Sequence, residues 1–204
     1  MAASGDSALN QEYRLYCLNV GNLFTEFARL ENLLTSALKL HLAFNIGSPE
    51  DVKAMRLASA IYGSMRFKAS RDTIKRLLEV EGCPKPRVAF VENLFVQVGH
   101  IEAIRDKIAH QMVVPAHSDL GAFWQVSDMV TTRNIQQLKV WVFDTDAVLF
   151  AAQDLNKIGD FLGKRPITNR LFDHIAEFSP PSWRYKPSML KLVPHSKLKA
   201  PPPP

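Results

Sequence analysis

The chain has 204 residues, of which 47% are hydrophobic, and its net charge is +5. This length is enough for one sizeable core, and no apolar run approaches the roughly 18 residues that a membrane-spanning helix needs, so we expect no membrane partner. Two cysteines are too few for a disulfide framework, and the first residues lack the basic start and apolar stretch of a secretory signal, which together favour a cytoplasmic protein.

The first predicted element is a long amphipathic helix over residues 13–46. This stretch has no proline, and its large apolar residues recur at steps of three or four, the period of one helical face. Gly47 ends this helix. Pro49, at a first helical position after a capping serine, predicts the start of a second helix over about residues 49–62. A third helix is predicted in RFKASRDTIKRLLEV, residues 66–80.

Lys68, Arg71 and Lys75 recur at helical spacing in the third predicted helix. A basic stripe of this kind can follow the phosphate backbone of RNA. A solvated helix face, however, produces the same pattern without any ligand. Both interpretations stay open at the level of sequence, and the solvated face is the more common of the two.

The fourth predicted helix begins near Pro86 and runs for about 28 residues, because its apolar residues keep a helical period until Pro115 breaks the pattern. Arg105 stands between Ile101 and Ile108, inside the apolar stripe. An unpaired buried guanidinium costs several kcal/mol. Arg105 is therefore expected either to find a partner or to reach past its neighbours to water. The acids considered as partners are Glu31 and Glu102.

Two stretches rich in aromatic and β-branched residues follow, GAFWQVSDMV and LKVWVFD, joined by the polar TTRNIQQ. Their partial alternation predicts a two-stranded hairpin near residues 122–143. A helix capped by Asp144 or Thr145 is expected next, and Gly163 is expected to end it. A short last helix from Thr168 completes the series.

The C-terminal region, residues 164–204, carries eight Lys and Arg residues against two acids, and its prolines predict an extended arm. Such an arm can hold nucleic acid or an acidic partner, or it can simply increase solubility. The elements together predict a mainly α protein, a bundle of about six helices with an inserted β-hairpin and an extended C-terminal arm. Residues 1–163 would form the helical domain, and the basic region would pack on it or trail from it.

The sequence RDKIAH, residues 105–110, combines an arginine, an aspartate and a histidine near the end of the fourth predicted helix. Asp106 and His110 are four residues apart and share a helix face, so the carboxylate can accept a hydrogen bond from the imidazole. The planar fork of arginine suits phosphate, and histidine transfers protons near neutral pH. These residue types fit metal-free cleavage of a phosphodiester.

Arg105 lies about 140° from His110 around an ideal helix. One copy of the chain would therefore have difficulty in aiming both side chains at the same phosphate. A second copy of the helix, packed antiparallel across a two-fold axis, would solve this problem. The catalytic interpretation thus predicts a homodimer.

The motif resembles the signature of the HEPN family (higher eukaryotes and prokaryotes nucleotide-binding), in which an arginine is followed a few residues later by a histidine on a long helix of a helical bundle. RDKIAH matches this pattern, with the polar Asp106 and the small Ala109 where the family favours such residues. The resemblance covers residues 14–163. The chain departs from the family in having Asp106 where asparagine is common and Gln111 where glycine often follows.

The resemblance implies a metal-independent endoribonuclease without a cofactor, in which a ribose 2′-hydroxyl attacks the adjacent phosphate and leaves a cyclic phosphate end. It implies that Arg105 stabilises the charge on the phosphate, that His110 acts as general acid or base, and that Asp106 orients one of them. It also implies a role as a toxin or in phage defence, with a homodimeric state and a protein antitoxin as a further partner.

The alternative is a non-catalytic helical module that binds a nucleotide, RNA or a protein partner. The same three residues would then serve as an interface network. The absence of HExxH, GxxxxGKS and GxSxG motifs disfavours zinc hydrolases, nucleoside triphosphatases and serine hydrolases.

Overall fold

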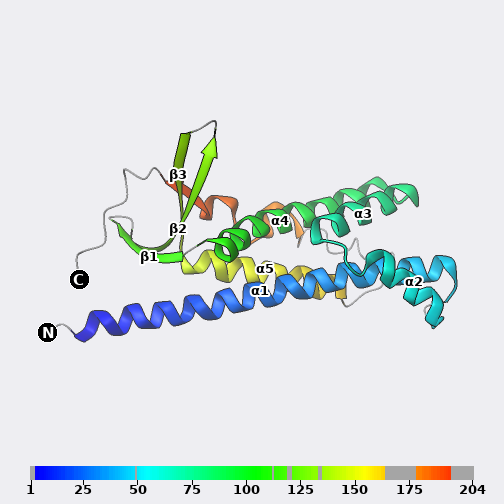
Figure 1. The fold of residues 1–204 in the computed structure, drawn as a ribbon, viewed down its shortest axis with the longest axis horizontal. Helices are drawn as coiled ribbons and strands as arrows, with labels where there is room; N and C mark the ends of the chain where they lie inside the picture. The colour runs from blue at the N-terminus through cyan, green and yellow to red at the C-terminus, as the bar shows by residue number, and fades with distance from the viewer. Residues whose placement is uncertain are drawn as a thin grey trace. The chain divides into compact units, whose positions relative to one another are not determined.

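The computed structural model describes residues 3–48, 50–111, 113–118, 121–132, 135–163 and 178–193 (Figure 1). Within these ranges the chain is mainly helical, as predicted, with five α-helices and one four-stranded antiparallel sheet. The helices are α1 (Ala3–Ile46), α2 (Val52–Tyr62), α3 (Phe67–Val80), α4 (Lys85–His110) and α5 (Thr145–Gly163). The strands are β1 (Val113–Ser118), β2 (Gly121–Thr132), β3 (Ile135–Phe143) and β4 (Lys191–Val193). The short helix predicted from Thr168 lies outside the described residues.

The chain divides into two compact units, each built from segments that are far apart in the sequence. The first unit comprises Met1–Phe24, Val98–Asp154 and Arg184–Pro204. The second comprises Thr25–Gln97 and Leu155–Trp183. Helices α1, α4 and α5 each contribute residues to both units.

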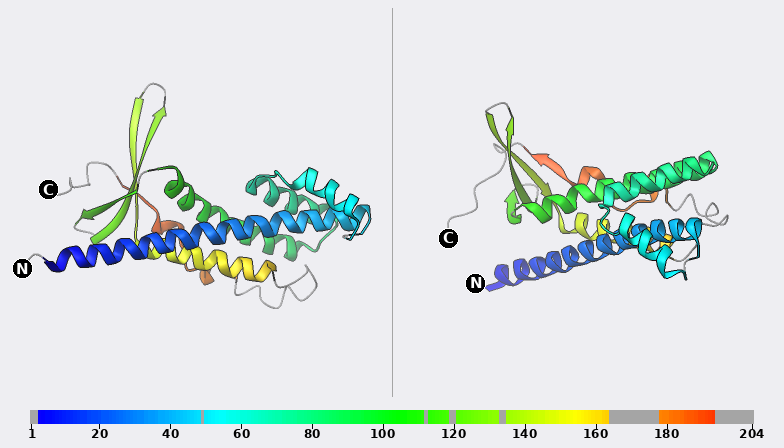
Figure 2. Two further views of the ribbon diagram at one scale, coloured as in Figure 1. Left: turned by 60° about the horizontal axis from the view of Figure 1, so that its bottom comes forward. Right: turned by 45° about the vertical axis from the view of Figure 1, so that its right-hand side comes forward.

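The sheet belongs to the first unit and has the strand order β1-β2-β3-β4. The predicted hairpin is confirmed, and Figure 2 shows β2 and β3 extending together from the sheet. Two further strands were not predicted. Strand β1 contains Pro115, which an edge strand tolerates because its outer side needs no hydrogen-bond donor. Strand β4 comes from the C-terminal arm and pairs with β3, with Val193 opposite Val140.

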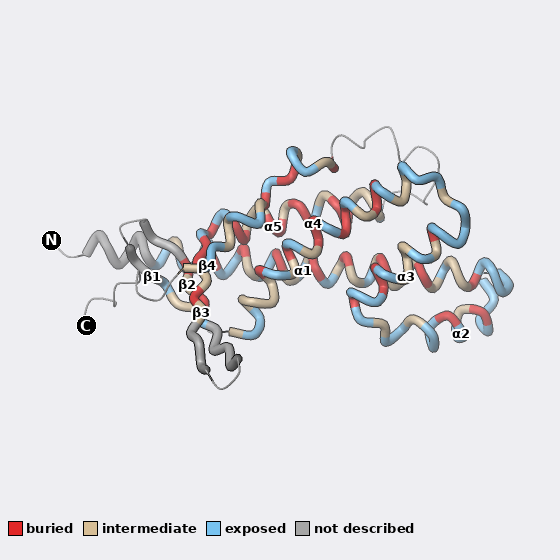
Figure 3. Tube along the Cα trace, turned by 90° about the horizontal axis from the view of Figure 1, so that it is seen from above, coloured by how far each residue is buried: buried red, intermediate tan, exposed pale blue. Residues whose placement is uncertain are grey.

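Helix α1 buries one continuous face, as its apolar period predicts, and buried positions recur along it in Figure 3. It ends at Ile46, as predicted. The predicted start of the second helix is wrong, because α2 begins at Val52 rather than at Pro49. The side chain of Asp51 accepts a hydrogen bond from the Lys53 N–H at 2.8 Å, and this bond caps the helix. The buried side chains of α1 are Tyr16, Asn19, Leu23, Phe27, Leu30, Leu34, Leu38 and Ala43.

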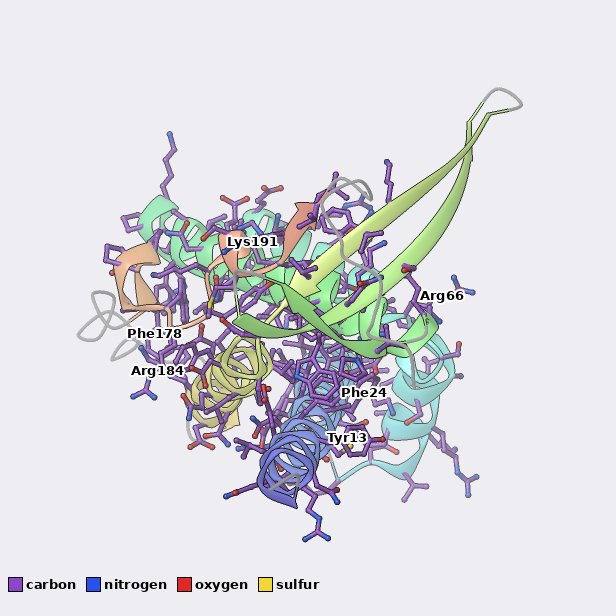
Figure 4. All side chains as sticks on the ribbon, turned by 90° about the vertical axis from the view of Figure 1, so that its left-hand side faces the viewer. Tyr13, Phe24, Arg66, Phe178, Arg184 and Lys191 are labelled. Carbon is purple, nitrogen blue, oxygen red and sulfur yellow. The ribbon has the colours of Figure 1, made fainter. Side chains whose placement is uncertain are left out.

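Aromatic packing joins α1 to the sheet within the first unit. The Trp124 ring stacks on the Tyr16 ring with centroids 4.0 Å apart, and Tyr13, labelled in Figure 4, lies 6.0 Å from the same indole. Trp124 Nε1 donates a hydrogen bond to Thr145 Oγ1 at 2.9 Å. Of the two predicted caps of α5, Asp144 is the one that accepts, from the Ala147 N–H at 2.7 Å. These contacts hold the hairpin against both helices.

The second unit is held by its own aromatic clusters and ion pairs. Phe161 packs against both Phe90 and Phe178, with centroid distances of 5.4 Å and 4.6 Å, and those two rings also contact each other at 5.8 Å. Arg29 forms an ion pair with Asp160, with 2.6 Å between Nη2 and Oδ1. Such contacts fix the second half of α5 on the neighbouring helices of this unit. Among the described residues, none of the helices combines the length and the apolar content that crossing a bilayer requires.

Candidate functional site

The motif residues lie on the last two turns of α4, in the first unit. The helix ends at His110, and β1 begins three residues later, at Val113. His110 is exposed, whereas the Arg105 side chain is 22% exposed and that of Asp106 is 49% exposed. His110, the proton-transfer candidate, therefore faces solvent at the end of the helix, and Arg105 is half-buried.

Asp106 forms an ion pair with its neighbour Arg105. Arg105 Nη1 lies 2.9 Å from Asp106 Oδ1, and Asp106 was not among the partners expected from the sequence. In the described part of the chain, Asp106 makes no hydrogen bond to His110. The carboxylate therefore orients the guanidinium rather than the imidazole in this conformation.

A lysine within the motif contacts a tryptophan of β3, and sequence reasoning did not single out this pair. Lys107 Nζ lies 5.2 Å from the centroid of the Trp141 ring, a cation–π contact between α4 and β3. Trp141 Nε1 is buried and has no hydrogen-bond partner among the described residues, and the same is true of Oε1 of Gln111, the residue that follows the motif. The position of Lys107 three residues before His110 is the signal that could have drawn attention to it.

The three basic side chains of α3 that were considered as an RNA-binding stripe differ in exposure and in partners within the second unit. Lys68 is exposed, but Arg71 is only 8% exposed and donates from Nη1 to the carbonyl oxygen of Phe95 at 3.3 Å. Lys75 pairs with Glu92, with 3.8 Å between Nζ and Oε1. These contacts give Arg71 and Lys75 structural roles, so the three side chains do not form one open basic face.

The described residues also form an open groove of about 590 Å³ along α1 in the second unit, and it contains none of the motif residues. Within the described ranges, no group of three or more His, Cys, Asp or Glu side chains could hold a metal ion. The groove is lined by Thr25, Ala28, Arg29, Asn32, Leu33 and Ser36.

No protein-family model, no curated protein and no solved structure matches this chain. The resemblance to the HEPN family therefore rests on residues 105–110 and on the helical layout around them.

Proposed function

We propose that this chain is a metal-independent endoribonuclease of the HEPN type that acts as a homodimer. The observation that carries the proposal is the arrangement of RDKIAH, in which an exposed His110 and a half-buried, ion-paired Arg105 occupy the last two turns of one helix. A nuclease of this kind would fit a toxin or defence role in which a protein antitoxin restrains it.

The proposed reaction is an attack of a ribose 2′-hydroxyl on the adjacent phosphorus. His110 accepts the hydroxyl proton as the bond between the 2′ oxygen and phosphorus forms. The bond between phosphorus and the 5′ oxygen breaks, and that oxygen leaves with a proton from solvent. Arg105 stabilises the negative charge that accumulates on the phosphate oxygens, and Asp106 holds the guanidinium in place. The products are a 2′,3′-cyclic phosphate and a free 5′-hydroxyl.

Helix geometry supports a composite site in a dimer. Arg105 and His110 point about 140° apart on one helix. A phosphate beside His110 of one copy would therefore receive its guanidinium from Arg105 of the other copy. Light scattering should show a dimer at micromolar concentration, and a monomer would remove the physical basis of the proposal.

The test is incubation of purified protein with mixed RNA in excess chelator. Wild-type protein should produce cyclic phosphate ends, and His110→Ala and Arg105→Ala should each lose this activity by about a hundredfold or more. His100→Ala is the matched control, because His100 is exposed on the same helix but lies outside the motif. If RNA remains intact with a folded wild-type dimer, the chain is not a nuclease of this type.

One observation favours the second candidate, a non-catalytic module that binds RNA, a nucleotide or a protein. The Asp106 carboxylate neutralises Arg105 at 2.9 Å, which is also what an interface salt bridge would look like. RNA binding that is strong and salt-sensitive and survives His110→Ala, in the absence of any cleavage, would favour this module.

A further inference from the structure

We infer that Lys107 is a phosphate-binding residue of a single-stranded RNA site beside His110 and that Trp141 positions it. This inference rests on the proposed function. It gives a role to Lys107, which lies within RDKIAH but takes no part in the proposed reaction, and to Trp141, which lies outside the motif. Lys107 is on α4 and Trp141 is on β3, and both belong to the first unit.

The side chains of Lys107 and His110 leave α4 in similar directions. Lys107 precedes His110 by three residues, so the two side chains are about 60° apart around α4. Arg105 is about 140° from His110 on the same helix. Of the two cationic side chains in the motif, Lys107 is therefore the one that can reach a phosphate bound at His110 of its own chain.

A contact with an aromatic ring holds Lys107. Its Nζ lies 5.2 Å from the centroid of the Trp141 ring, and the side chain is half-buried. A lysine normally loses considerable rotamer freedom when it binds a phosphate. The cation–π contact already restricts the stem, so less freedom remains to be lost on binding. Trp141 acts through Lys107 and is a positioning residue.

Trp141 and Gln111 each have one polar side-chain atom without a partner among the described residues. Trp141 Nε1 is a buried donor and Gln111 Oε1 is a buried acceptor, and neither has a hydrogen-bond partner among the described residues. Buried polar groups are almost always paired. The Trp141 donor belongs to the residue that holds Lys107, so a polar ligand at this contact would supply the hydrogen bond that the indole lacks among the described residues.

The experiment measures binding rather than cleavage, with a 2′-O-methyl RNA oligonucleotide that has no attacking hydroxyl. Lys107→Met keeps the stem of the side chain and removes the charge. It should weaken binding about tenfold and lower the slope of log affinity against log salt by about 0.7, the value for one phosphate contact on a single strand. Lys107→Arg should retain affinity within about twofold, because it keeps both the charge and the cation–π contact.

The control is Lys53→Met, which removes an exposed lysine from α2 without touching the site. If Lys107→Met binds as tightly as wild type, or loses no more affinity than Lys53→Met, the inference is wrong. Trp141→Leu should weaken binding in the same direction as Lys107→Met, and Trp141→Phe should weaken it less because the ring is retained.

A measurement on the wild-type chain covers the case in which a variant does not fold. The indole N–H resonance of Trp141, assigned by its absence in Trp141→Phe, should shift when the oligonucleotide is added. No shift at saturating RNA would overturn the inference.

The nuclease proposal and the Lys107 proposal can fail independently. Binding that depends on Lys107, without cleavage of unmodified RNA, refutes only the nuclease. Cleavage with binding indifferent to Lys107 refutes only the subsite.

Discussion

At the scale of single residues, Tyr185 connects burial to pH dependence. Its side chain is 1% exposed, and burial raises the pKa of its phenol to about 12. An unfolded tyrosine has a pKa of about 10. Between these two values the unfolded chain loses the phenol proton while the folded chain keeps it. The stabilisation from keeping Tyr185 neutral is thus fully present below pH 10 and is lost as the pH rises toward 12.

Tyr185→Phe isolates this effect, because phenylalanine fills nearly the same volume and does not ionise. We expect the free energy of unfolding of the wild type to fall, relative to that of the variant, by about 1 kcal/mol between pH 9 and pH 11. Burial also raises the pKa of Tyr16, but Tyr16 is present in both proteins and cancels in the comparison. Guanidinium unfolding curves at pH 8, 9, 10 and 11 measure the difference. A constant difference across this range would contradict the assigned pKa.

Much of the motif region was predictable from the sequence at the residue scale, because it depends on spacing along one helix. The position of Arg105 in the apolar stripe and the outward direction of His110 both follow from a step of about 100° per residue. The contact between Lys107 and Trp141 did not follow. It depends on which residues of β3 face α4, and that is set by tertiary packing rather than by local period.

At the scale of elements, the helices were predictable where a strong period extends over many residues, as in α1 and α4. The hairpin was predictable from its alternation. Strand β1 was missed because Pro115 was interpreted only as a helix breaker, although an edge strand accepts it. Strand β4 has three residues, too few to show any alternation, and exists only because β3 offers it a partner.

The attachment of the C-terminal arm to α5 gives the prediction at this scale. Asp154 is 2% exposed, and its two carboxylate oxygens accept hydrogen bonds from the backbone N–H groups of Arg184, at 3.1 Å, and Tyr185, at 3.0 Å. Arg184 and Lys191, which mark the course of this arm, are labelled in Figure 4. A buried carboxylate with two backbone donors is a strong anchor, since hydrogen bonds to charged groups contribute more than neutral ones.

Asp154→Asn replaces one acceptor with a donor that faces an N–H group. We expect it to destabilise the protein by about 3 kcal/mol and to expose the arm to trypsin at Arg184 and Lys191. Gln153→Ala is the matched control. It removes only the exposed hydrogen bond from Arg184 Nη1 to Gln153 Oε1, and it should change stability by less than about 0.5 kcal/mol. Equal effects of the two variants in thermal unfolding and limited proteolysis would show that Asp154 does not anchor the arm.

At the scale of the whole molecule, the division into two units was beyond the sequence. Each unit joins segments separated by many residues, and the first unit takes in residues from the start, the middle and the end of the chain. A period reveals which face of a helix is buried, but not which distant segment covers it. The long helices α1, α4 and α5 have no break where one unit gives way to the other, so composition and turn signals do not mark the boundary.

The proposed dimer makes the last prediction, which concerns two copies of the chain. If each active site combines Arg105 of one copy with His110 of the other, a heterodimer of Arg105→Ala and His110→Ala copies has one site with both residues intact and one site with neither. Purified through two different affinity tags, this heterodimer should cleave RNA at about half the wild-type rate, although each parent homodimer is inactive. A heterodimer of the double variant with either single variant is the control, and it should stay inactive. If the heterodimer of the two single variants is inactive, Arg105 and His110 of different copies do not form one site. Both side chains would then have to reach the same phosphate from one chain, although they point about 140° apart on α4.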